Sequence, residues 1–193
     1  MPEIGCIEML SNFMANSIIV TNQQTIPPKD STVILSETNG VEYSIEIKKI
    51  PTKFILIKPE NLDFLIKNIS GMKGEKQISD YILISESTNG NWIIYIELKK
   101  GGRTCTNIKI REQLIGSKCS MEYCKWLVKF FWEGDSHFEG YQERYVCLNT
   151  LKQRLNKKPT RPPHHQLHDT PDKFLSLDGG EGIFFMRLIE QSR

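Results

Sequence analysis

The stretch from Asp80 to Lys100 constrains the fold more than any other part of the sequence. It consists of two runs of apolar and β-branched residues joined by Asn89-Gly90. An Asn-Gly pair between two such runs is a strong short-range signal for a β-hairpin with a two-residue turn. The sequence therefore predicts two antiparallel strands, with charged residues gathered at the open end of the hairpin.

The geometry of that open end follows from the turn. A two-residue turn places Asp80 opposite Lys99 and Glu97 opposite Ile82, one diagonal step from Asp80. Side chains alternate along a strand, so Glu97 and Lys99 share a face while Leu98 points the other way. Diagonal neighbours lie about 7–8 Å apart, close enough for two carboxylates to hold one cation between them. We expect a metal site there with a lysine beside it.

Residues 30–49 repeat this pattern around a second Asn-Gly pair. A two-residue turn there places Asp30 opposite Lys49, on the face away from Glu46 and Lys48, so the three groups cannot converge. We therefore expect this hairpin to be scaffold, with Glu46 and Lys48 solvated. Both arguments require hairpins without a bulge, because one inserted residue reverses the faces.

The remaining pattern predicts a single α/β domain, residues 1–193, with a central mixed β-sheet flanked by α-helices. The expected elements are helices at 4–14, 62–69 and 107–130, strands at 18–20, 33–35, 43–50, 54–57 and 144–148, and a final hairpin at 174–189 around Gly179-Gly180.

The longest predicted helix begins near Thr106 or Asn107, either of which can cap it. Gly116 and Ser120 are points where it could break into two helices. An apolar stripe follows its helical spacing, and we expect that stripe to pack in the core rather than to stack on nucleic-acid bases. The stripe consists of Ile108, Ile115, Cys119, Tyr123, Trp126 and Phe130.

Asp80 is followed, after sixteen residues, by Glu97-Leu98-Lys99. The helix predicted after this motif carries Gln113. This pattern resembles the PD-(D/E)xK nuclease superfamily, several branches of which place a glutamine on the following helix. Ser79 stands where many members have proline. The resemblance covers about residues 59–131 and implies a restriction-endonuclease-like fold.

The resemblance also implies roles for these residues. Asp80, Glu97 and the carbonyl of Leu98 would hold Mg²⁺, with Mn²⁺ as a substitute. Lys99 would orient or deprotonate the attacking water and stabilise charge on the phosphate. Gln113 would bind water or the backbone phosphate.

The resemblance further implies the substrate and its contacts. A third carboxylate, with Glu60 as the candidate, would complete the site. We expect a DNA endonuclease in restriction or phage defence, although the residues themselves do not separate DNA from RNA. Cleavage of both strands by a single-site nuclease needs two active sites, so we expect a homodimer. The residues expected to contact phosphate are Lys100, Arg103, Lys109 and Arg111.

Two other interpretations remain open. Asp80 and Lys99 could form only a cross-strand ion pair worth about 0.2–1 kcal/mol. The chain could also keep a nuclease-like fold without catalysis, as a nucleic-acid-binding or protein-binding module or an immunity-type partner.

Composition limits the other function classes. The net charge of +2 and the 25% charged residues do not indicate a strongly basic nucleic-acid binder, so any basic surface is local. No apolar run approaches the roughly 18 residues of a membrane span, and the first 20 residues do not resemble a signal peptide. The five cysteines form no Cys-x-x-Cys pair, which favours reduced thiols in the cytoplasm.

A histidine-rich segment is a weaker candidate for a metal site. Imidazole is a good ligand for transition metals. The neighbouring prolines instead favour a loop that is exposed or contacts phosphate. The segment contains His164, His165, His168 and Asp169.

Overall fold

A computed structural model provides the structure of the chain. It describes residues 5–14, 19–23, 31–37, 43–62, 77–100, 106–131, 138–149, 167–180 and 182–190.

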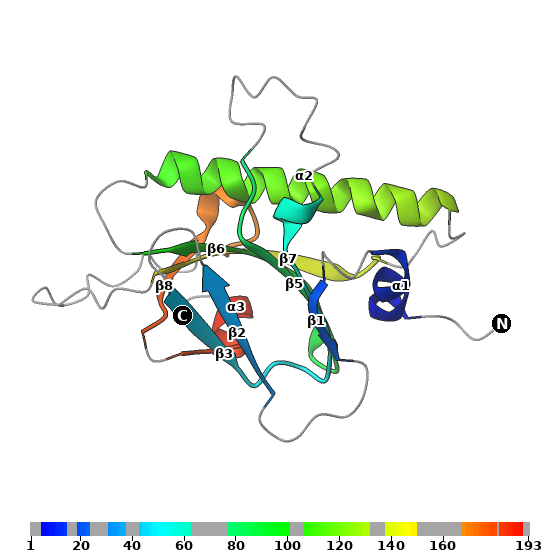
Figure 1. Cartoon of the computed structure of the whole chain (residues 1–193), viewed down its shortest axis with the longest axis horizontal. Helices are drawn as coiled ribbons and strands as arrows, with labels where there is room; N and C mark the ends of the chain where they lie inside the picture. The colour runs from blue at the N-terminus through cyan, green and yellow to red at the C-terminus, as the bar shows by residue number, and fades with distance from the viewer. Residues whose placement is uncertain are drawn as a thin grey trace, which may run out of the picture.

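A six-stranded mixed sheet forms the centre of the molecule (Figure 1). The last three strands in its order run parallel to one another, and the other neighbours pair antiparallel. The long helix α2, Asn107–Phe131, joins the central strand β6 to its parallel neighbour β7. In spatial order the strands are β1 (Ile19–Gln23), β4 (Lys53–Ile57), β5 (Tyr81–Ser87), β6 (Gly90–Lys99), β7 (Tyr141–Asn149) and β8 (Leu175–Asp178).

A smaller three-stranded sheet lies on one side of the large one, and helices α1 and α2 lie on the other (Figure 1). The small sheet has the order β2, β3, β9, in which β9 runs parallel to β3. Its bounds and those of the remaining elements are β2 (Thr32–Glu37), β3 (Tyr43–Lys48), β9 (Ile183–Phe184), α1 (Cys6–Phe13), α3 (Met186–Ile189) and the short 3-10 helices η1 (Pro59–Asn61) and η3 (Pro171–Lys173).

The alternation of side chains in β5 and β6 creates two apolar cores. Leu83 and Ile94 face the small sheet and α3, whereas Ile84 and Ile93 face α1 and α2. Strands buried on both faces need nearly continuous apolar sequence, which explains the two uninterrupted apolar runs around the hairpin turn. The predicted α/β class with a mixed sheet is confirmed, and the small second sheet was not predicted.

The predicted hairpin around Gly179-Gly180 is wrong. β8 continues the large sheet beside β7, while β9 joins the small sheet beside β3, so the chain crosses from one sheet to the other. Gly179 packs against Ile45, and a Cβ there would lie 2.7 Å from the Ile45 Cδ1 atom. The glycine therefore serves a close approach between the layers rather than a reversal within one sheet.

The final segment is anchored by two buried polar side chains. Arg144 on β7 lies with its guanidinium 4.7 Å from the centre of the Trp92 ring and donates to the Ile189 carbonyl at 3.2 Å. The His168 Nε2 atom lies 2.7 Å from the Leu188 carbonyl oxygen. Two consecutive carbonyls at the end of α3 are therefore held from the large-sheet side.

Helix α2 is one unbroken helix, and Thr106 caps it by accepting a hydrogen bond from the Lys109 N–H at 3.4 Å. The predicted buried stripe is wrong. Ile108, Trp126 and Phe130 are 65%, 52% and 69% exposed. The face that packs on the sheet carries smaller side chains at the same helical spacing. They are Ile110, Leu114, Ser117, Ser120, Met121, Cys124 and Val128.

Other expectations have mixed outcomes. Helix α1 and strands β1 and β7 lie where helix and strand were expected. The helix expected at 62–69 lies outside the described residues, apart from Leu62, and η1 precedes it. None of the helices in the described residues is long and apolar enough to cross a membrane.

A candidate metal centre at the end of the central hairpin

The register of the β5–β6 hairpin differs from the prediction. Ser87 pairs with Gly90, so Thr88 and Asn89 form the two-residue turn and Gly90 opens β6 with a φ of +124°. The Ser87 hydroxyl fixes this turn, because it accepts from the Asn89 N–H at 3.2 Å and donates to the Gly90 carbonyl at 2.9 Å. The predicted cross-strand partners are therefore displaced by two residues.

A displacement of two residues changes partners but not faces. Pairing is continuous from Ser87 back to Tyr81, which lies opposite Ile96. Asp80 is the next residue, so it comes opposite Glu97 and not opposite Lys99. Glu97 and Lys99 still share the face that looks toward α2, because the preceding residue of that face, Tyr95, belongs to the helix-side core. Asp80 and Glu97 are therefore directly opposite each other, rather than diagonal neighbours as predicted.

Asp80 is held at the sheet end by contacts from both sheets. Its Oδ2 accepts from the Leu98 N–H at 2.6 Å, and its carboxyl hydrogen-bonds to the side chain of Glu37 at the end of β2. Burial raises the pKa of Asp80 to about 8, and the charges of Glu97 and Glu37 act in the same direction. Three carboxyl groups are therefore crowded at this point.

Glu97 is 1% exposed. Its Oε1 pairs with the Lys99 ammonium, while its buried Oε2 has no hydrogen-bond partner in the described part of the chain. Burial raises the pKa of Glu97, and the neighbouring Lys99 and Gln113 oppose that rise. A buried carboxylate oxygen without a donor is costly unless something binds to it.

Gln113 closes the group from α2. The Lys99 ammonium donates to its Oε1 at 3.1 Å as well as to Glu97. Lys99 remains 22% exposed along its side chain, so it links the buried acids to the surface. The structure thus brings together the four residues expected to be catalytic, Asp80, Glu97, Lys99 and Gln113.

The segment before Asp80 is fastened directly to α2. The Ser79 N–H donates to the Ser117 hydroxyl at 2.8 Å, and the two hydroxyl oxygens are 2.7 Å apart. At Gly116, a Cβ would lie 1.8 Å from the Gln77 carbonyl oxygen, so only glycine allows this approach. A proline at this position would lack the N–H that Ser79 uses here. These contacts at Ser117 and Gly116 fix the distance between α2 and the segment that leads into Asp80.

The predicted phosphate contacts are only partly placed. Lys100 and Lys109 are exposed, near the end of β6 and the start of α2. Arg111 is also exposed but pairs with Asp172 of η3. Arg103 lies outside the described residues.

A third acid beside Asp80 comes from an unexpected element. Glu60 is exposed on η1 and pairs with Lys58 at 3.7 Å. Glu37 instead hydrogen-bonds to Asp80. No spacing in the sequence indicates this, because Glu37 belongs to the hairpin expected to be scaffold.

That first hairpin also has a different register. Glu37 pairs with Tyr43, so five residues connect the strands and the pairing is one residue away from the prediction. Glu46 and Lys48 form a half-exposed ion pair at 3.3 Å, which agrees with the expected solvated charges. Asp30 lies outside the described residues.

The histidine-rich segment provides no metal site in the described residues. His168 is buried and bonds to the Leu188 carbonyl, and His164 and His165 lie outside the described part. Across the described ranges, no three or more histidine, cysteine or acidic side chains are arranged to hold a metal ion. A cation at Asp80 and Glu97 would therefore need ligands beyond these side chains, such as the Leu98 carbonyl and water.

Cys6, Cys119, Cys124 and Cys147 form no disulfide bond in the described part of the chain, and Cys105 lies outside the described residues.

Comparisons of the chain with protein-family models, with curated proteins and with solved structures found no match.

Proposed function

We propose that this protein is a metal-dependent nuclease of the PD-(D/E)xK type that hydrolyses phosphodiester bonds in DNA. The observation that carries the proposal is the state of Glu97. Its Oε2 is buried without a partner in the described residues, and it lies opposite Asp80 at the strand end. Two acids and a lysine on one strand end are the groups that this reaction needs.

The donor atoms fit a hard divalent cation. Asp80 and Glu97 supply carboxylate oxygens and Leu98 supplies a carbonyl, which are the ligand types that Mg²⁺ and Mn²⁺ take. A bound Mg²⁺ would neutralise charge on the attacked phosphate and lower the pKa of a water molecule. It would also relieve the repulsion that the buried acids experience without it.

Lys99 and Gln113 would act on the reacting groups. Lys99 is held by Glu97 and Gln113, which fixes its ammonium at the border between the acids and solvent. From that position it would orient the attacking water and stabilise negative charge on the phosphate. Lys100 and Lys109 are exposed beside this border, where they would contact the backbone phosphates.

DNA as the substrate and a role in restriction or phage defence rest on analogy with the superfamily. The competing proposal is a non-catalytic binding module. It is supported by Lys99, which already neutralises one oxygen of Glu97, and by the absence of a cluster of three ligand side chains in the described part of the chain.

Plasmid cleavage tests catalysis. The purified chain is incubated with supercoiled DNA and Mg²⁺, Mn²⁺ or EDTA. We expect cleavage with either metal, none with EDTA, and a loss of about 100-fold or more in Glu97→Gln and Lys99→Ala. Glu46→Gln and Lys48→Ala are matched controls, because they remove the same Glu-x-Lys pair from an exposed position.

The outcomes separate the two proposals. Cleavage by Glu97→Gln and Lys99→Ala at the wild-type rate would place catalysis elsewhere. A wild-type chain inert on both DNA and RNA would favour the binding module. A second readout is thermal unfolding, in which Mg²⁺ should raise the Tm of the wild type more than that of Glu97→Gln.

A further inference from the structure

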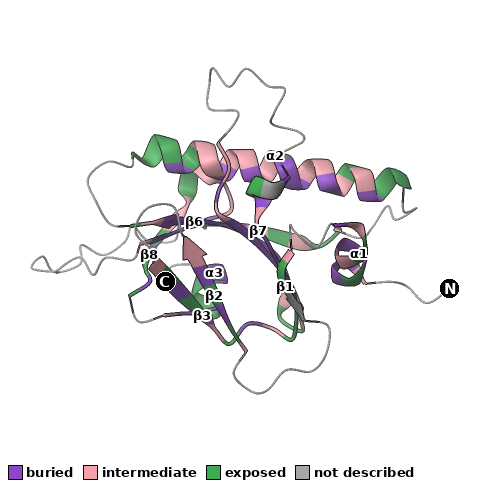
Figure 2. Cartoon of the chain, in the orientation of Figure 1, coloured by how far each residue is buried: buried purple, intermediate pink, exposed green. Residues whose placement is uncertain are grey.

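Helix α2 is apolar on two faces, and only one of them packs on the sheet. The outer face carries Ile108, Ile115, Cys119, Tyr123, Trp126 and Phe130, which we call the outer stripe. The Trp126 and Phe130 rings stack on each other with centroids 5.6 Å apart. In Figure 2 buried residues lie on the side of α2 toward the sheet, and exposed residues gather at its two ends.

Large exposed apolar side chains are concentrated on this helix. Among the described residues, four of the eight such side chains belong to α2, namely Ile108, Trp126, Phe130 and Phe131. From their exposed fractions and typical areas, they leave about 500 Å² of apolar surface per copy. Exposed apolar area of this size, divided between the two ends of one helix, favours an interaction surface along it.

The outer stripe is symmetric about Cys119. Ile108 and Phe130 each lie eleven residues from Cys119, and Ile115 and Tyr123 each lie four residues from it. A second α2 that runs antiparallel would therefore meet five of these six positions with another apolar position, and the sixth, Trp126, with Glu112. Such self-complementarity is the requirement for a two-fold interface.

We propose that two copies of this chain associate through the outer stripe, with the α2 helices antiparallel and the Cys119 residues on the two-fold axis. Glu112 and Trp126 are each seven residues from Cys119, so Glu112 would face Trp126 of the second copy. Lys129 lies one turn further, over the Trp126 ring at 5.6 Å. The symmetry doubles each of these contacts.

The area and the geometry fit this arrangement. Stable interfaces bury about 800 Å² per partner, of which the exposed Ile108, Trp126 and Phe130 of the stripe supply about half. The other stripe residues and the polar flanks would supply the remainder. Packed helices lie about 8–10 Å apart with Cα atoms about 2.3 Å from each axis. Two Cys119 residues that face each other would then be within the range for a disulfide bond.

Cross-linking at Cys119 tests the proposal. Cys6, Cys124 and Cys147 are buried, so a Cys105→Ser background leaves Cys119 as the thiol for reaction. We expect copper-phenanthroline oxidation to give a covalent dimer on a non-reducing gel. The dimer should be absent from Cys105→Ser/Cys119→Ser.

Light scattering of the unmodified chain gives a second readout. We expect a dimer at tens of micromolar, at least a tenfold weaker association in Trp126→Glu, and no change in Ile34→Glu, which replaces an exposed apolar residue of β2 (59% exposed). Circular dichroism confirms that both variants are folded.

A monomeric wild type at 100 µM, or equal cross-linking in Trp126→Glu, would overturn the proposal. A monomer would mean that the stripe binds something other than a second copy. Neither readout depends on nuclease activity, so the proposed function and this interface can fail separately.

Discussion

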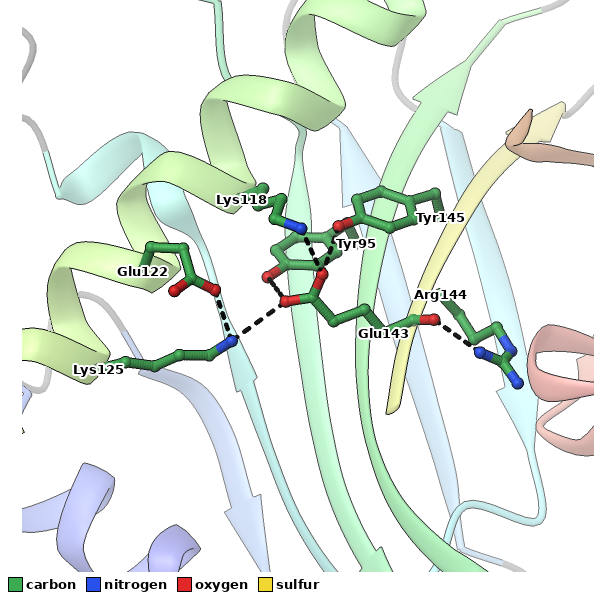
Figure 3. Close-up of polar contacts among 7 residues, drawn as sticks. All are labelled: Tyr95, Lys118, Glu122, Lys125, Glu143, Arg144 and Tyr145. Carbon is green, nitrogen blue, oxygen red and sulfur yellow. Dashed lines mark hydrogen bonds and ion pairs between the residues drawn. The ribbon is translucent and has the colours of Figure 1, made fainter. Parts of the chain in front are cut away.

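Two glutamates lie beneath the same helix, each beside lysine, one buried and one partly buried, and their surroundings are opposite. Glu97 on β6 has one lysine on Oε1 and no partner on Oε2 among the described residues. Glu143 on β7 has two donors on each oxygen, as Figure 3 shows. They are the Tyr145 hydroxyl at 2.6 Å, Lys118 at 2.9 Å, Lys125 at 3.1 Å and the Tyr95 hydroxyl at 3.2 Å.

The electrostatics follow from the number of donors. Burial raises the pKa of Glu143, but Tyr145, Lys118 and Lys125 outweigh it and lower that pKa to about 2. Burial raises the pKa of Glu97, and Lys99, Gln113 and the Asp80 backbone oppose it only in part. A buried acid next to a lysine is therefore not evidence of a binding site by itself. The missing donors distinguish Glu97, because only an incompletely satisfied carboxylate leaves room for a cation.

The largest effect should come from breaking the satisfied cluster. Glu143→Gln removes the charge that Lys118 and Lys125 share under α2 and should lower the free energy of unfolding by about 3 kcal/mol. Urea unfolding measures the change. Glu46→Gln, at a half-exposed ion pair, is the control and should change stability by less than about 1 kcal/mol. A similarly small loss of stability in Glu143→Gln would mean that water can replace Glu143 as the partner of Lys118 and Lys125.

The pH dependence should show the same cluster. The folded-state pKa of Glu143 is lowered from 4.5 to about 2, so its contribution is present above pH 4.5 and is lost as the pH falls toward 2. The free energy of unfolding should fall by at most about 3 kcal/mol over this range. Unfolding measured at pH 2–5 should show a shallower acid slope in Glu143→Gln than in the wild type. Equal slopes would exclude Glu143 as the cause.

The smallest effect on stability is expected at the proposed site. Glu97→Gln removes a buried charge that repels Asp80, while Lys99 can regain water because its side chain is partly exposed. We expect the free energy of unfolding without metal to change by less than about 1 kcal/mol, in either direction. A loss as large as that of Glu143→Gln would mean that Glu97 is a structural acid, and the contrast between the two glutamates would disappear.

The sequence predicted the convergence of Glu97 and Lys99 although it placed the turn incorrectly. Strand periodicity fixes faces, and the two-residue displacement kept them, so the shared face was correct while the partner of Asp80 was not. At the first hairpin the displacement was one residue, which reverses the faces. The turn depends on the Ser87 hydroxyl, which no Asn-Gly rule includes.

Two features could not be predicted from local pattern. Helix α2 contains two apolar stripes of equal period, and only the sheet decides that Leu114 and Val128 are buried while Trp126 and Phe130 are exposed. The contact of Glu37 with Asp80 joins residues far apart in sequence and in different sheets. Both depend on how layers pack, which periodicity within one element does not specify.

The anchoring of α3 has a consequence for how the chain acquires its fold. Ile183, Phe185 and Leu188 complete the core beneath the small sheet, and β9 pairs with β3 across more than 130 residues of sequence. Contacts of such separation form slowly, because a long loop must close first. During synthesis one apolar face of the β2–β3 hairpin would therefore remain exposed until residues 183–189 emerge from the ribosome. We expect this face to be the point at which a chaperone can intervene.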